Sequence, residues 1–120
     1  MTHETTNDDF EVFKEAGKKE VGRLGLSDWK IWFQHDIDIA YNDSCALCLT
    51  SYEDKQATIQ LNPTWDDKPT KETLEYYGRH EIIELLLADY SYHAESRFAK
   101  KEDLNATRHA LIQRIINAYK

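Results

Sequence analysis

Residues 44–61 restrict the fold more than any other part of the sequence. They contain two strand-like runs, residues 44–52 and residues 56–61, separated by a short polar turn. Apolar and polar residues alternate along the second run, with the apolar positions at Ala57, Ile59 and Leu61. This alternation is typical of a strand with one buried face. Because such a short turn joins only strands that run in opposite directions, we expect an antiparallel hairpin.

Helical patterns lie on both sides of this hairpin. Apolar residues recur at near-helical spacing over residues 8–24, and residues 29–33 are aromatic and β-branched, which predicts a further strand. Thr70 can cap a helix that runs over residues 70–90, and a last helix is expected over residues 103–119. The sequence therefore predicts an α+β fold with an N-terminal helix, a small three-stranded antiparallel sheet, and two further helices, all packed on one face of the sheet.

The bulk properties of the chain indicate a single domain, residues 1–120, in a reducing compartment. The chain has 120 residues, of which 41% are hydrophobic, and only its polar residues 1–7 are expected to be disordered. No apolar run approaches the roughly 18 residues of a membrane span, and the polar N-terminus does not resemble a signal peptide. Two cysteines three residues apart do not make a disulfide framework, so we expect a cytoplasmic protein without membrane contact.

The net charge of −7 bears on the choice of partner. Nucleic-acid binding depends on basic side chains that neutralise phosphates, so an acidic chain argues against that class of protein. The acidic residues are scattered along the sequence, a distribution that favours solubility. We therefore expect no nucleic-acid partner, with an acidic protein that imitates nucleic acid as a remote alternative.

The helix predicted over residues 70–90 carries His80 and Glu81 followed by Glu84. His80 and Glu84 are four residues apart, so they share one helix face with Cβ atoms about 5–6 Å apart. A zinc ion can bridge two ligands at this spacing. Ile83 and Leu87 flank the same face, so we expect the pair to point inward. Glu81 has the position of the general base that activates water in zinc peptidases.

A catalytic zinc ion needs three protein ligands and one open position, so a third ligand must come from elsewhere in the chain. His109 is the best candidate, because it lies in line with Ile112 and Ile116 on the last helix and should face the core. His80, Glu84 and His109 would then supply two imidazoles and one carboxylate. This is the ligand set of thermolysin-type enzymes, with one glutamate and one histidine exchanged.

Other arrangements compete with this ligand set. His93 or Glu95 can replace His109, and a set with Glu95 is richer in oxygen and suits iron or manganese better than zinc. Arg97 can instead pair with a buried carboxylate such as Glu84. The plainest interpretation is that the histidine and the carboxylate form a buried hydrogen-bonded pair that only fixes how the helices pack.

Residues 80–87 resemble the active-site helix of small gluzincin-like zinc metallopeptidases. They resemble more closely a group of uncharacterised phage proteins that carry HExxE where the peptidases carry HExxH, so Glu84 stands in place of the second histidine. Residues 25–29, 94–98 and 109–114 are also similar to that phage group and occur in the same order. The resemblance therefore covers roughly residues 24–117 and implies a phage origin.

The resemblance implies a minimal zincin fold, with a three-stranded sheet, an active-site helix and a supporting helix, that acts with zinc on a peptide or protein. His80, Glu84 and His109 would hold the metal, and Glu81 would be the general base. Residues 56–61 would be the edge strand that pairs with an extended substrate. The main alternative is a non-catalytic phage-type accessory or binding protein on the same fold, in which the polar cluster or a metal serves the structure.

Overall fold

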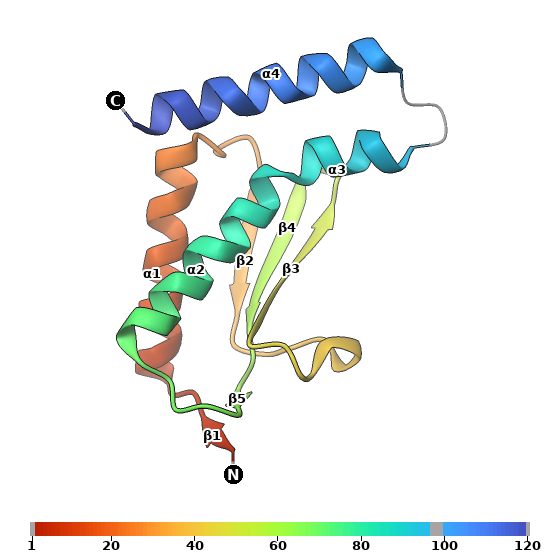
Figure 1. Cartoon of the computed structure of the whole chain (residues 1–120). Helices are drawn as coiled ribbons and strands as arrows, with labels where there is room; N and C mark the ends of the chain where they lie inside the picture. Colours follow the sequence, from red (N-terminus) through yellow and green to blue (C-terminus); the bar gives the residue numbers. More distant parts are fainter. Residues whose placement is uncertain (1, 97–99, 120) are drawn as a thin grey trace.

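The computed structural model describes residues 2–96 and 100–119 and has a mixed α+β architecture (Figure 1). In chain order the described elements are β1 (His3–Glu4), α1 (Asn7–Leu24), β2 (Lys30–Gln34), a 3₁₀ turn (Ile39–Tyr41), β3 (Ala46–Ser51), β4 (Gln56–Leu61), β5 (Thr64–Trp65), α2 (Lys71–Leu86), α3 (Ala88–Glu95) and α4 (Lys101–Ala118). The predicted sequence of helix, strands and helices is therefore present, with additional short elements.

The main sheet has the strand order β2-β4-β3. β3 and β4 form the predicted antiparallel hairpin, but β2 runs parallel to β4, so the expectation of a wholly antiparallel sheet is wrong. Residues 35–45 are long enough to carry the chain past the middle of the sheet before β3 begins. The middle position goes to β4, whose inward side chains are at most 1% exposed: Ala57, Ile59 and Leu61.

The middle position of β4 changes one expectation about function. Both edges of β4 are occupied, one by β2 and the other by β3. Residues 56–61 therefore cannot be the edge strand that receives an extended substrate. Within the part of the chain that the structure describes, the outer edges of this sheet belong to β2 and β3.

The hydrophobic core lies between the sheet and the helices α1 and α2. Its largest fully buried side chains come from both helices, from the central strand and from the segment after α1: Phe13, Leu26, Ile59, Leu61, Leu74, Ile82 and Leu85. Trp29 and Trp65 are also buried. Trp32 is 47% exposed, because it alternates with the core residues Ile31 and Phe33 and points to the opposite face of the sheet.

Residues 3–6 are part of the fold, although residues 1–7 were expected to be disordered. Strand β1 pairs antiparallel with β5, with His3 opposite Trp65. The hydroxyl of Thr5 donates to the carbonyl oxygen of Asn62 at 2.9 Å. Thr6 caps α1 by accepting from the backbone N–H of Asp9, and the side chain of Asp9 accepts from the backbone of Thr6 in return. This network holds the start of α1 against the end of β4.

The single helix predicted over residues 70–90 is divided in two at Leu87, where α2 ends and α3 begins. The last helix, α4, begins two residues earlier than predicted and runs past the C-terminal end of α1 and alongside α3 (Figure 1). None of its residues Lys101–Ala118 is buried. Arg114 attaches α4 to α1 by donating to the carbonyl oxygens of Leu24, at 3.3 Å, and Gly25.

Across residues 2–96 and 100–119, every helix is too short or too polar to cross a membrane.

A glycine contact sets how closely α1 and α2 approach. A Cβ atom at Gly78 would overlap the carbonyl oxygen of Phe13 and lie 3.1 Å from the Cβ of Ala16. The backbone of α1 cannot move away from this Cβ atom without disturbing the core, because Phe13 is fully buried. We therefore predict that Gly78→Ala lowers the free energy of unfolding by about 1–3 kcal/mol, measured by urea denaturation.

Gly22→Ala is the matched control, because a Cβ atom at Gly22 meets no described atom within 4 Å. Alanine is the better helix former, so this variant should be unchanged or more stable by up to about 1 kcal/mol. Equal unfolding midpoints for the two variants would contradict the close contact at Gly78.

Candidate functional site

The polar residues of α2 do not lie as the sequence predicted. The side chains of His80 and Glu84 are 44% and 56% exposed, whereas that of Glu81 is 8% exposed. The expectation of an inward-facing His80–Glu84 pair is therefore wrong. Helix α2 packs on α1 and the sheet through the face that contains Gly78, Ile82 and Leu85. Ile83 and Leu87, which were expected to lie beside the pair in the core, are therefore exposed to solvent.

His80 nevertheless joins the two carboxylates. Its Nδ1 atom forms a hydrogen bond of 3.0 Å with Oε2 of Glu81, in the tautomer that carries a proton on Nδ1. Its Nε2 atom lies 3.9 Å from Oε1 of Glu84. The imidazole therefore sits between a buried and an exposed carboxylate, and protonation of the ring would strengthen both contacts.

The buried position of Glu81 changes its ionisation. Burial raises the pKa of the Glu81 carboxyl above its ordinary value of 4.5, against the opposing effect of the hydrogen bond from His80, and the charge of Glu84 raises it further. Cys48, on β3, has its pKa raised to about 12 by burial and by the charges of Glu81 and Glu84. The carboxylates of α2 thus act directly on the side of β3 that faces this helix.

The structure does not bring together the predicted metal ligands. His109 is exposed on α4, and within residues 2–96 and 100–119 no three His, Cys, Asp or Glu side chains form a group able to hold a metal ion. A catalytic zinc site needs three protein ligands, and here His80 and Glu84 supply two. The residues therefore do not fit a complete zinc centre in this arrangement.

The alternative ligands are not brought to the pair either. His93 and Glu95 lie on α3, where the ring of His93 packs against Tyr52 with ring centroids 6.0 Å apart. Arg97, which was considered as a partner for a buried carboxylate, lies outside the described residues. What the structure retains from the predicted site is the contact of His80 with Glu81 and Glu84.

Of the cavities that border α2 and its continuation, α3, two lie beside residues of the predicted site. One, of about 550 Å³, lies between α1, α2 and α4 and opens beside His80; its apolar lining includes Ile83, Leu87, Ile115 and Tyr119. Ile112 and Ile116 of the last helix were expected to face the core, but both are exposed. The apolar spacing was read correctly as helical, but it gives no information about whether a neighbour covers that face.

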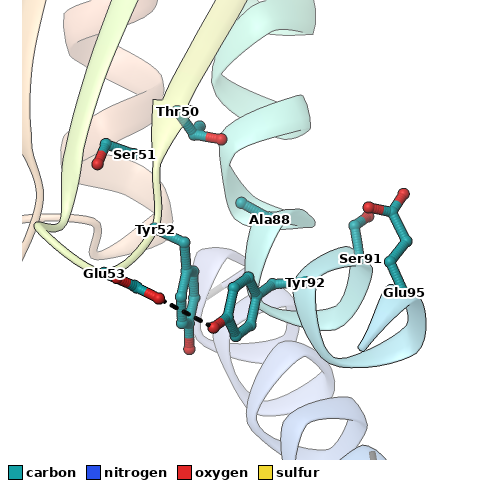
Figure 2. A pocket seen from close by; sticks show the side chains of 8 residues that line it. All are labelled: Thr50, Ser51, Tyr52, Glu53, Ala88, Ser91, Tyr92 and Glu95. Carbon is teal, nitrogen blue, oxygen red and sulfur yellow. Dashed lines mark hydrogen bonds between the residues drawn. The ribbon is translucent and has the colours of Figure 1, made fainter. Parts of the chain in front are cut away.

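The second cavity, of about 400 Å³, lies between the end of β3 and α3 (Figure 2). The rings of Tyr52 and Tyr92 stack inside it with centroids 4.1 Å apart, and the Tyr92 hydroxyl donates to Oε1 of Glu53 at 3.5 Å. Glu95 lies on the α3 side and Thr50 on the strand side. This cavity was not predicted from the sequence, because it depends on where α3 lies after the break at Leu87.

No family model matches the chain, and no curated protein or solved structure matches it either. The resemblance to HExxE phage proteins and to gluzincin-like peptidases therefore stays a prediction.

The raised pKa of Glu81 predicts a pH-dependent contribution to stability. Because the folded protein holds this proton more tightly than the unfolded chain, the contribution is fully present below the ordinary pKa of 4.5 and is lost as the pH rises through the folded-state pKa. We predict that Glu81→Gln, which cannot ionise, gains stability relative to the wild type as the pH rises from 4 to 7. Urea denaturation across this range measures the difference.

Glu72→Gln is the control for this experiment, because Glu72 is an exposed carboxylate in the first turn of the same helix. Its stability difference from the wild type should change much less over the same range. A Glu81→Gln difference that stays constant with pH, or that moves in the opposite direction, would contradict a raised pKa at this position.

Proposed function

We propose that the protein binds a peptide or protein segment in extended conformation, as an additional strand beside β3. The observation that supports this proposal is the position of β3 at the edge of the sheet. In the described part of the chain, residues Ala46–Ser51 pair on one side with β4 and have no strand on the other side. An edge strand presents backbone N–H and C=O groups that an extended segment can pair with.

The composition of β3 favours this use of its edge. Natural edge strands usually carry charged residues or proline that prevent pairing with another chain. The strand Ala46-Leu47-Cys48-Leu49-Thr50-Ser51 contains neither, and its first four residues are apolar or cysteine. An unprotected edge of this kind is expected where pairing with a partner is part of the function.

The neighbouring helices give the proposed strand a surface to lie against. Helix α2 contacts β3, so a segment added to the edge of β3 would pass beside this helix. Beyond Thr50 the same segment would reach the cavity between β3 and α3 (Figure 2). The role of edge strand, which was predicted for residues 56–61, is therefore proposed for β3.

Selection from a library of random ten-residue peptides, with the full chain immobilised, tests the proposal. The strongest binder is then synthesised in two forms, with backbone N-methyl groups on the odd or on the even residues. Because alternate N–H groups of a strand point to the same side, we predict that one form loses binding by more than about tenfold and the other keeps most of it.

The two methylated peptides serve as controls for each other, because they differ only in which side of the strand is blocked. Fluorescence anisotropy with the labelled peptides measures both affinities. Two forms that bind equally would exclude pairing with β3. A selection that enriches no peptide above an unrelated immobilised protein would exclude peptide binding altogether.

A second candidate function is that of a zinc-dependent peptidase-like protein. It is favoured by the contact of His80 with a buried carboxylate of raised pKa, since such shifts are concentrated at functional sites. His80 and Glu84 would be two of its ligands. A third ligand would require a different position of α4, the helix that carries His109, and no residue of Lys101–Ala118 is buried in the present one.

Zinc binding distinguishes this candidate. If it is correct, the purified chain binds one zinc ion, and His80→Ala, Glu84→Gln and His109→Ala each weaken binding by about 10- to 100-fold or more in competition with a chelating dye. Glu81→Gln should keep the metal and lose peptide cleavage.

His3→Ala is the matched histidine control, because His3 lies on β1 and is not a candidate ligand, and it should bind zinc as the wild type does. Zinc binding that His80→Ala leaves unchanged would place the metal elsewhere. A chain that binds no zinc would leave His80, Glu81 and Glu84 as a structural cluster.

A further inference from the structure

The cavity at the end of β3 continues the edge at which the extended segment is proposed to bind. Thr50 and Ser51, the last two residues of β3, line the cavity on one side. Ala88 and Ser91 of α3 line it on the other side, so the cavity is open between a strand and a helix (Figure 2). A side chain of a segment paired with β3 would enter it near Thr50.

The charge of this cavity is negative. Glu53 and Glu95 both line it, and its lining residues include no lysine, arginine or histidine. Lys55 and His93 contact the ring of Tyr52, and Lys55 is paired with Asp89. Both glutamates are exposed, so their side chains are accessible to a partner. An acidic side chain entering the cavity would be repelled, and an apolar one would remove water from two carboxylates without replacing their hydrogen bonds.

The aromatic walls favour the same kind of guest. Tyr52 and Tyr92 are stacked with an interplanar angle of 15°, and aromatic faces attract cations. The chain already places one lysine against this pair: Nζ of Lys55 lies 4.6 Å from the ring centroid of Tyr52 and 3.3 Å from Oδ1 of Asp89. A second cation between tyrosine and carboxylate would repeat an arrangement that the protein itself uses.

We propose that this cavity receives a lysine or arginine side chain of the segment bound along β3, with Glu53 and Glu95 as its ion-pair partners. The inference rests on the proposed function and names the class of partner: an extended segment with a basic residue at one fixed position. The guest's aliphatic stem would lie against Tyr92, while its charged end would reach the carboxylates.

The sequences of the peptides enriched in the same selection test this inference. Peptides enriched on the wild-type chain should carry Lys or Arg at one aligned position. Replacing that residue by norleucine in the best peptide should weaken binding about tenfold, and raising the salt concentration should weaken the parent peptide more than the norleucine peptide.

Variants of the protein give the complementary measurement. In Glu53→Gln/Glu95→Gln the amide oxygen can still accept from the Tyr92 hydroxyl, so the fold is kept while both charges are lost. This variant should bind the parent peptide about tenfold more weakly than the wild type and the norleucine peptide about equally well. The control Glu11→Gln/Glu72→Gln removes two exposed carboxylates outside the cavity and should bind both peptides as the wild type does.

The outcomes separate the two proposals. Peptides that pass the N-methyl test but show aromatic or aliphatic residues at the aligned position, or that tolerate norleucine, would overturn the basic guest and leave strand pairing intact. Peptides that need the basic residue but ignore backbone methylation would overturn strand pairing, and with it this account of how the segment reaches the cavity. A selection without binders would overturn both.

Discussion

The close contact between α1 and α2 at Gly78 determines the rest of the arrangement. Because Gly78 lies against the backbone of α1 at Phe13, the rotation of α2 about its own axis is fixed. That rotation buries Glu81 and leaves His80 and Glu84 facing outward. The electrostatic environment of the polar cluster is therefore a consequence of one helix contact that involves no charged atom.

Local patterns predicted the elements of the fold well, because they depend on neighbouring residues. The turn at residues 53–55 and the alternation in β4 led to the correct hairpin, and Thr70 was correctly identified as a helix cap. The parallel pairing of β2 was missed, because no pattern within residues 29–33 records which strand will fill the neighbouring position. Strand order depends on the path of the connection, which the sequence does not display.

The candidate site shows the same division between local and tertiary information. The spacing of His80 and Glu84 correctly placed them on one helix face, but their orientation was inferred from Ile83 and Leu87, which lie on the exposed side. The helix is instead buried through the face that contains Leu74, Gly78 and Ile82, because a glycine allows closer packing than any side chain. The role of His109 depended on where α4 packs, and an amphipathic pattern alone does not fix this.

The attachment of α4 has a consequence for how the molecule opens. No residue of Lys101–Ala118 in α4 is fully buried. Leu111 and Ala118 pack partly buried against the core, and Arg114 donates to the carbonyl oxygens of Leu24 and Gly25. An isolated helix of this length is marginal in water. The amides of α4 should thus exchange with solvent through a local opening of low free energy, long before those of α1 and α2, which open only when the whole core unfolds.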